Sequence, residues 1–182
     1  VPGCIHRGIS EKTANKIYDD MIDFAKYAFN KSHAAAYAVV SYQTAFLKYY
    51  YPVEYMAALM TSVIHNPSKV AEYILSSRKM QIEILPPDIN FGESEFSADH
   101  GAIRYGLSAI KSLGAPMIRA IVEERKENGK YQSLRDFIER MSGRELNKRA
   151  IENLIKAGAL DQVAGNRRQK LMVYAEIVDA VN

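Results

Sequence analysis

Two short segments combine a lysine, a glycine and small neighbours as phosphate-binding turns do. They are Ile110–Ala115 (Ile-Lys-Ser-Leu-Gly-Ala) and Leu154–Ala159 (Leu-Ile-Lys-Ala-Gly-Ala). A glycine lets the backbone turn tightly and leaves amide groups uncovered at the start of the next helix, where they can hold an anion. Two such turns would contact the phosphates of both strands of a duplex without reading its bases. The alternative is that Gly114 and Gly158 only terminate helices, as glycine commonly does.

Positive charge is concentrated in the same half of the chain. Residues 1–100 hold 9 Lys and Arg against 11 Asp and Glu, a net charge of −2, whereas residues 101–182 hold 15 against 10, a net charge of +5. Such an excess attracts a phosphate backbone through counterion release, although a solvated helical surface would explain it equally well. The residues expected to contact a duplex are Lys111, Ser112, Leu113, Gly114, Ala115, Lys148, Arg149, Lys156, Ala157, Gly158, Ala159, Arg167 and Arg168.

The sequence contains no pattern typical of a metal-dependent catalytic centre. Phosphoryl transfer with two metal ions needs aspartates placed around ions about 3.5–4 Å apart. Asp19, Asp20 and Asp23 instead alternate with apolar residues on one expected helix, where a solvated surface is the simpler explanation. The four histidines lie far apart, without the spacing of metal ligands. We therefore expect no catalytic residue and no metal site in this chain.

Helical patterns occupy the first 80 residues. Ser32 is suited to cap one helix, Pro52 to begin the next, and Asn66 to cap a fourth that starts at Pro67. The helix after Ser32 has apolar or aromatic residues on nearly every face, which predicts that it lies buried or beneath a bound ligand. The expected helices are 11–28, 33–51, 52–63 and 67–80.

The pattern changes after this helical part. Residues 82–85 alternate like a short strand, Pro86-Pro87 ends it, and Asp99-His100-Gly101 is typical of a hairpin turn. A domain boundary is therefore placed after residue 85. Beyond it, two helix–glycine–helix units lie about 45 residues apart, and the last helix is expected at 167–181. The fold class is mostly α, with a minor β-hairpin or short strands near 82–106.

Composition excludes several other classes of protein. The chain has 182 residues, of which 48% are hydrophobic and 25% charged, as in one or two small globular domains. The longest uncharged aliphatic and aromatic run, Ala34–Leu47, has 14 residues, whereas a membrane span needs about 18, so no membrane partner is expected. The single cysteine favours a reducing cytoplasm. A start at Val1 without a leader suggests a piece of a longer protein.

Several blocks resemble a known family. Phe29–Ala38 (Phe-Asn-Lys-Ser-His-Ala-Ala-Ala-Tyr-Ala), followed by Ser41-Tyr42-Gln43-Thr44, is similar to the fingers signature of bacterial DNA polymerase III alpha subunits, the C-family replicative polymerases. Further blocks resemble the same family in the same order, so the resemblance covers effectively the whole chain. These blocks are 51–58, 84–90, 105–111, 146–149 and 157–161.

The resemblance implies two functional parts. Residues 1–85 would be the C-terminal part of the polymerase fingers, and residues 86–182 a tandem helix-hairpin-helix domain that binds duplex primer-template DNA. The full-length protein would be a DNA-directed DNA polymerase that acts in DNA replication. Its catalytic aspartates and Mg²⁺ would belong to a palm domain outside this chain, so the chain alone would be inactive. The sliding clamp and other replisome subunits would bind elsewhere.

The resemblance also assigns nucleotide-binding residues and reveals one departure. Lys31, Ser32 and His33 would contact the incoming dNTP, because amides and a cation at a helix start suit a triphosphate. Tyr42 and Gln43 would lie near the base or the terminal base pair, although packing explains Tyr42 equally well. Without the resemblance, His33 would be interpreted as a helix-capping or core histidine. The family usually has Gly-Val-Gly where this chain has Ser112-Leu113-Gly114, followed by Pro116, which lacks an amide donor. The first hairpin is therefore expected to bind phosphate more weakly.

Two alternatives remain open. A stand-alone helix-hairpin-helix module of a repair protein would explain the basic half but not the block at residues 29–44. A helical protein-interaction module would make the tyrosine-rich helix a partner groove and the basic charge incidental. The second alternative predicts little salt-dependent affinity for DNA.

Overall fold

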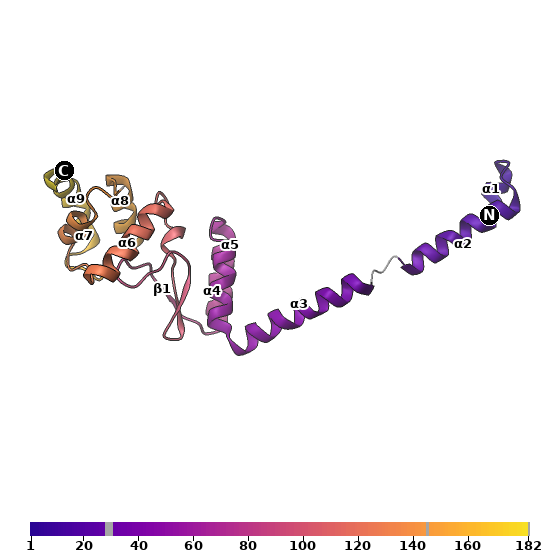
Figure 1. Cartoon of the computed structure of the whole chain (residues 1–182), viewed down its shortest axis with the longest axis horizontal. Coiled ribbons are helices and arrows are strands. Elements are labelled where there is room, and N and C mark those ends of the chain that lie inside the picture. Colours follow the sequence, from indigo (N-terminus) through magenta and orange to yellow (C-terminus); the bar gives the residue numbers. More distant parts are fainter. Residues whose placement is uncertain (28–30, 145, 182) are drawn as a thin grey trace. The chain divides into compact units, whose positions relative to one another are not determined.

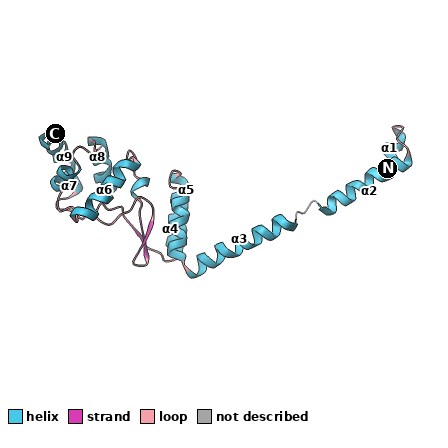
Figure 2. Ribbon diagram, in the orientation of Figure 1, coloured by secondary structure: helices cyan, strands magenta, loops and turns pink. Residues whose placement is uncertain are grey.

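Helices account for most of the chain, as the apolar spacing predicted (Figure 2). The computed structural model describes residues 1–27, 31–144 and 146–181. It divides into two compact units, Val1–Leu47 and Lys48–Asn182. No helix of the described residues is long and apolar enough to cross a membrane.

The first unit contains three helices, labelled in Figure 1. They are α1 (Pro2–His6), α2 (Glu11–Tyr27) and α3 (Lys31–Tyr50), whose last turn enters the second unit. Ser10 precedes α2, and its hydroxyl accepts a hydrogen bond from the Thr13 amide at 3.3 Å. On the apolar stripe of α2, Ala14 is buried, but Ile17, Met21 and Phe24 are solvent-exposed, and Phe24 keeps 77% of its surface.

One expectation for α3 is wrong. Ser32 does not cap the helix, because α3 already begins at Lys31 and Ser32 lies in its first turn. The side chains of this helix are largely exposed, with Tyr42 at 71% and Tyr49 at 78%. That the helix lies beneath a bound ligand stays a prediction. Within the first unit, neither α1 nor α2 packs extensively against α3. The block Phe29-Asn30 lies outside the described residues.

The second unit begins with two helices packed on a small sheet. Helices α4 (Pro52–Ser62) and α5 (Pro67–Lys79) start at the predicted prolines, and the Asn66 side chain accepts a hydrogen bond from the Lys69 amide at 3.2 Å. The sheet has the order β1-β3-β2, with β1 parallel and β2 antiparallel to β3. Its strands are β1 (Ile84–Leu85), β2 (Ser97–Asp99) and β3 (Ala102–Arg104). The core between helices and sheet consists of Met56, Ala57, Met60, Val70, Ile82, Phe96 and Ile103.

The predicted hairpin turn is confirmed. His100 and Gly101 connect β2 to β3, and both have positive φ angles, +50° and +86°, as a two-residue type I′ turn requires. Strand β3 also pairs with β1, which lies before the boundary expected after residue 85. The sheet therefore joins residues on both sides of that boundary within one compact unit. As a division of function, the boundary stays a prediction.

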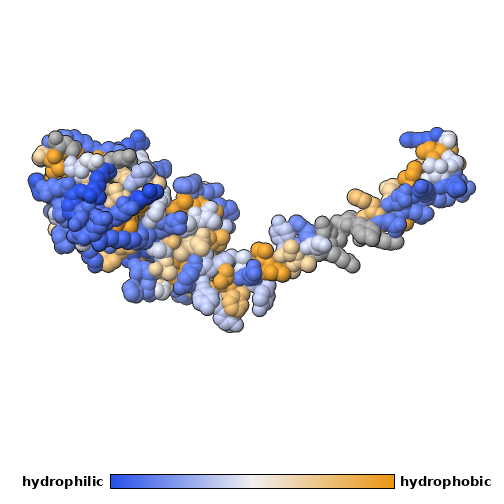
Figure 3. All heavy atoms as spheres, viewed as in Figure 1, coloured by the Kyte–Doolittle hydropathy of each residue, from blue (hydrophilic) through white to orange (hydrophobic). Residues whose placement is uncertain are grey.

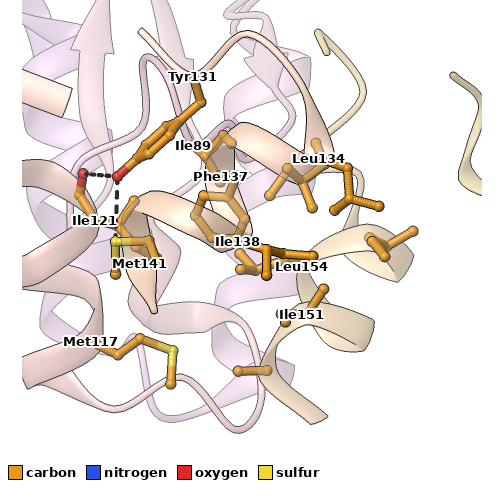
Figure 4. Packing of buried hydrophobic residues seen from close by; sticks show 14 of the residues in the cluster. Ile89, Met117, Ile121, Tyr131, Leu134, Phe137, Ile138, Met141, Ile151 and Leu154 are labelled. Carbon is orange, nitrogen blue, oxygen red and sulfur yellow. Dashed lines mark hydrogen bonds between the residues drawn. The ribbon is translucent and has the colours of Figure 1, made fainter. Parts of the chain in front are cut away.

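A second core is built by the last four helices. The 3₁₀ helix η1 (Leu107–Ala109) leads into α6 (Ala115–Asn128), which is followed by α7 (Leu134–Met141), α8 (Lys148–Ala157) and α9 (Arg167–Val181). Figure 4 shows Tyr131 reaching into this core, where its hydroxyl donates to the Ile121 carbonyl at 3.0 Å. Burial raises the pKa of Tyr131 to about 12. The largest buried side chains of this core include Ile118, Phe137, Met141, Ile151 and Leu154.

The segment 86–92 ties the strands to the helical core. The Ile89 amide donates to the Ala159 carbonyl at 2.9 Å, next to the second glycine turn. The Asn90 side chain donates to the Tyr131 carbonyl at 2.9 Å and accepts from the Tyr131 amide at 2.8 Å. Arg125 of α6 donates to the Ile89 carbonyl at 2.9 Å. This segment thus fixes α6 and the α8–α9 turn relative to each other.

Candidate nucleic-acid interface

The first hairpin runs from η1 to the start of α6. Gly114 caps α6 with an extended backbone, and its carbonyl accepts the Ile118 amide at 3.1 Å. Within the described part of the chain, the structure records no hydrogen-bond acceptor for the amides of Leu113, Gly114 and Ala115. Gly114 and Ala115 are exposed, and Leu113 is half-buried against the core. The hairpin thus offers exposed amide donors at the N-terminus of a 14-residue helix.

The tight turn of this hairpin lies at Ser112 and not at Gly114. Ser112 has a φ of +66°, in the left-handed region that favours glycine. Gly114 has a φ of −78°, and a Cβ there would meet only Pro116 Cδ, at an ordinary distance of 3.7 Å. The expectation that Gly114 provides the turn is therefore wrong. The family glycine that this chain lacks falls at the position where the backbone needs it.

The second hairpin differs from the first. Gly158 ends α8 with a left-handed φ of +88°, and its amide donates to the Ile155 carbonyl at 3.1 Å. The Ala159 amide donates to the Leu154 carbonyl at 3.0 Å, and the Ala159 carbonyl accepts from Ile89. Both Gly158 and Ala159 are buried. Because these two amides already donate hydrogen bonds within the fold, they are not available to a phosphate. Only side chains of the second hairpin could bind one at this turn.

The structure brings the two hairpins together through α8. Arg149, Asn153 and Lys156 are spaced four and three residues apart, so they share one face of this helix. The Asn153 side chain donates to the Lys111 carbonyl of the first hairpin at 2.9 Å. An open hollow of about 440 Å³ lies at this junction. It is lined by Pro87, Tyr105, Ala109, Ile110, Lys111, Asn153, Lys156 and Ala157.

Several expected duplex contacts are engaged in ion pairs. Lys148 pairs with Asp179, Lys156 with Glu152, and Arg167 with Asp161. The hydrogen bond from Arg167 is the main cause that lowers the pKa of Asp161. In contrast, the described structure records no ion pair for Lys111, Arg149 and Arg168, which are all exposed. These three side chains are the cations of the predicted set that form no recorded ion pair in the described structure.

Sequence reasoning did not identify Lys170, which organises the second hairpin. Its ammonium is buried and donates to three carbonyls of the preceding loop, those of Leu160 (2.7 Å), Val163 (2.8 Å) and Gly165. Burial lowers the pKa of Lys170. A signal was present in the sequence: Lys170 precedes Tyr174 by four residues and Ile177 by seven, so it lies on the apolar face of α9. A lysine at such a position needs several oxygen partners.

The candidate nucleotide site is spread along α3. Ser32 and His33 are exposed in its first turn, and the His33 and Tyr37 rings lie 4.3 Å apart. Tyr42 and Gln43 are also exposed, but nine residues of helix place Tyr42 about 13 Å beyond His33. The side chain of Lys31 is not among those that the structure describes. The described residues therefore present two separate exposed patches on α3 rather than one closed pocket.

The part of the chain that the structure describes contains no candidate metal-binding site. No group of three or more His, Cys, Asp or Glu side chains is placed there to hold an ion. Figure 3 shows mainly hydrophilic residues on the visible face of the body formed by α6–α9.

Comparison with known proteins identifies a helix-hairpin-helix motif over residues 81–170. The chain is similar to the DNA polymerase III subunit alpha of Thermus aquaticus, with 48% identity over 168 residues, which is 92% of this chain and 14% of the relative. The subunit of Deinococcus radiodurans is 47% identical over 93% of this chain and 13% of the relative, and that of Xylella fastidiosa (strain Temecula1) 45% identical over 98% and 15%. The chain thus spans about one seventh of these relatives, and the predicted resemblance is confirmed.

Proposed function

We propose that this chain, which is homologous to a segment of DNA polymerase III alpha subunits, binds duplex DNA without sequence preference through its two hairpins. The observation that carries the proposal is the junction where α8 meets the first hairpin. Lys111 and Lys156 line the hollow there, Arg149 shares one face of α8 with Lys156, and the exposed amides of the first hairpin follow Lys111 in the chain, all within the region that matches the helix-hairpin-helix motif. Cations and amides of this kind hold phosphates and leave base edges unread.

Duplex binding would depend on positive charge and on the position of the hairpin amides. An unpaired lysine or arginine that neutralises a phosphate releases condensed counterions, which drives binding at low salt. The amides of the first hairpin add hydrogen bonds at the positive end of the α6 dipole. The second hairpin contributes Arg168 and the exposed face of α8, because its own amides at Gly158 and Ala159 are already used. The strained Ser112 and the donor-free Pro116 make the first hairpin a weaker site than one with glycine at residue 112.

In the full-length protein we place this duplex binding within DNA replication. The polymerase would be a DNA-directed DNA polymerase whose aspartates and Mg²⁺ lie in a palm domain outside this chain. Bound Mg²⁺ would stabilise the charge of the transferring phosphoryl group there. Residues 86–182 would hold the newly made duplex, and the sliding clamp and other replisome subunits would bind elsewhere. The chain alone would have no polymerase activity, and its expected location is the cytoplasm.

A second part of the proposal concerns the incoming dNTP. Ser32 and His33 are exposed in the first turn of the 20-residue helix α3, where amides and the helix dipole favour a triphosphate. Tyr42 and Gln43 would face the base or the terminal base pair further along the same helix. Residues 1–85 would thus serve as the C-terminal part of the fingers. Substitution of His33 by Ala in the full-length polymerase is expected to raise KM for dNTP more than it lowers duplex affinity.

The experiment that tests duplex binding is fluorescence anisotropy with a labelled duplex of about 20 base pairs and the matching single strand. The chain is titrated at several salt concentrations. We expect affinity for duplexes of unrelated sequence to be equal and to fall steeply with salt, since each phosphate contact contributes about −0.9 to the slope of log K against log salt. Lys111→Glu and Arg149→Glu should weaken binding strongly.

Lys126→Glu is the matched control, because Lys126 lies on α6, where its ammonium already faces Glu93 at 3.7 Å. It makes the same change of net charge away from the hairpin junction. If it weakens duplex binding as much as Lys111→Glu does, the chain responds only to total charge, and the proposed interface is wrong. Absence of duplex binding at low salt would exclude autonomous binding altogether and would favour a protein-interaction module.

A further inference from the structure

The two hairpins are joined by one side-chain hydrogen bond. Asn153 lies in the middle of α8, is half-buried, and donates from Nδ2 to the Lys111 carbonyl, 42 residues earlier in the chain, at 2.9 Å. Of the described polar side chains on α8, it is the one recorded as bonded to the first hairpin. Arg149 and Lys156 flank it on the same helical face. The bond therefore links the turn that carries Lys111 to the helix that carries two other exposed cations.

This bond also orients a peptide group at the strained residue. In a trans peptide the carbonyl and the next amide point in opposite directions. Because the Lys111 carbonyl points toward α8, the Ser112 amide points away from it, and no acceptor for that amide is recorded in the described structure. Ser112 keeps its left-handed φ of +66° although this conformation is unfavourable for serine. A strained residue persists where its surroundings hold it in place, and the Asn153 bond supplies such a restraint.

We propose that Asn153 is a positioning residue that couples the two hairpins, so that Lys111 and Lys156 engage phosphates as one preformed unit. The inference rests on the proposed duplex binding and assigns a role within that site. Both lysines line the 440 Å³ hollow together with Asn153. Without the bond, the turn at 110–114 would gain conformations that place Lys111 and its amides away from the α8 cations. Binding to DNA would then have to order a turn that is already ordered in the parent chain, and this cost would lower the affinity.

The test measures duplex affinity of the full 182-residue chain and its Asn153→Ala variant by anisotropy at low salt. Alanine is the best helix former, so α8 should be retained. Loss of the restraint should weaken binding about three- to tenfold, the size expected for one hydrogen bond that preorders a site. Gln132→Ala is the matched control, because the Gln132 side chain donates to the Lys130 carbonyl at 2.9 Å in the loop before α7. It removes a bond of the same kind without touching the hairpins and should leave affinity unchanged.

A double-mutant cycle separates positioning from general stability. Lys111→Ala and Lys156→Ala are made singly and together, with Asn153 intact and with Asn153→Ala. With Asn153 intact, the combined loss of affinity should differ from the product of the single losses, because the two lysines act together. In the Asn153→Ala background the losses should multiply independently. Urea unfolding measures the stability of each variant. A change in the coupling between the lysines that does not track the change in stability indicates positioning rather than a general loss of folding.

The outcomes are distinct. If the parent chain binds duplex with steep salt dependence, while Asn153→Ala binds equally well and the lysine coupling is unchanged, the positioning role is overturned and the proposed function stands. If the parent chain does not bind duplex at all, both the proposed function and the inference fall. A three- to tenfold loss in Asn153→Ala, with loss of the lysine coupling, supports the inference.

Discussion

Ser112 has a left-handed backbone conformation that glycine adopts more easily. Ser112→Gly should raise the free energy of unfolding by about 0.5–1 kcal/mol, because relief of left-handed strain outweighs the greater freedom of glycine in the unfolded chain. Urea unfolding measures this change. Gln81→Gly is the control: Gln81 has a similar φ of +61° outside the hairpin. Both variants should be stabilised, but only Ser112→Gly should change duplex affinity.

The two hairpin glycines should respond very differently to alanine. At Gly158 the φ of +88° is unfavourable for alanine, so Gly158→Ala should cost about 1–2 kcal/mol of unfolding free energy, while the flexible Arg167 side chain can move aside for the new Cβ. At Gly114 the backbone is extended and open, so Gly114→Ala should cost less than about 1 kcal/mol, the loss of a glycine N-cap. Thermal or urea unfolding compares the two. Equal losses would show that Gly114 has a conformational role that its φ does not reveal.

At the scale of elements, α6 and α7 are held by a buried carboxylate. Glu124 of α6 accepts hydrogen bonds from Arg140 of α7 (3.1 Å) and Asn128 (2.8 Å), and its second oxygen lies 2.9 Å from Arg144. The Arg140 hydrogen bond is the main cause that lowers the pKa of Glu124 from its ordinary 4.5, and desolvation opposes it. A carboxyl whose pKa is lower in the folded state stabilises the fold above pH 4.5, and this contribution is lost as the pH falls through the lower folded pKa.

Glu124→Gln should therefore unfold at lower urea concentration than the parent chain at pH 7. The difference between the two midpoints should shrink as the pH is lowered below 4.5, where the parent carboxyl itself becomes protonated. Asp136→Asn provides a comparison, because Asp136 is another carboxyl paired with Arg140 but lies 3.5 Å away and is more exposed. Its effect at pH 7 should be smaller. A midpoint difference for Glu124→Gln that stays constant down to pH 3 would contradict this explanation.

Helix α8 contains its own competitor for phosphate. Glu152 forms an ion pair with Lys156 on the face that we assign to DNA. Glu152→Gln would release Lys156 and remove a negative charge, so duplex affinity at low salt should rise about two- to fivefold, with a steeper salt dependence. Glu127→Gln is the control, since it removes one acidic charge from exposed α6. Equal gains from both variants would indicate an effect of net charge alone.

At the scale of the whole molecule, duplex binding and the first unit should be separable. Both hydrophobic cores of the second unit draw their buried residues from position 56 onward. A chain of residues 48–182 should therefore keep the urea midpoint of the hairpin body and bind duplex within about twofold of the full chain, as expected for independent sites. Anisotropy and urea unfolding of the two chains measure this. A large loss of duplex affinity on removing residues 1–47 would mean that α2 or α3 contributes to DNA binding.

The sequence alone predicted several elements and the similarity to one family. Pro52 and Asn66-Pro67 placed two helix starts, because proline and asparagine act through the few residues next to them. His100-Gly101 placed the hairpin, since a two-residue turn needs positive φ angles that these residues tolerate. The blocks from residue 29 onward identified the homologous segment of DNA polymerase III alpha subunits. All these signals are local, so they do not depend on what the elements pack against.

Only the tertiary structure decided which of the candidate groups are available to a ligand. It buried Gly158 and Ala159, paired Arg167 with Asp161, and placed the tight turn at Ser112. It also brought Lys111 to α8 through Asn153, a contact across 42 residues that no local pattern indicates. The physical reason is that burial and hydrogen-bond partnership depend on neighbours that are distant in sequence. Residue types therefore predicted the chemistry of the hairpins, and packing determined which of their groups remain free to perform it.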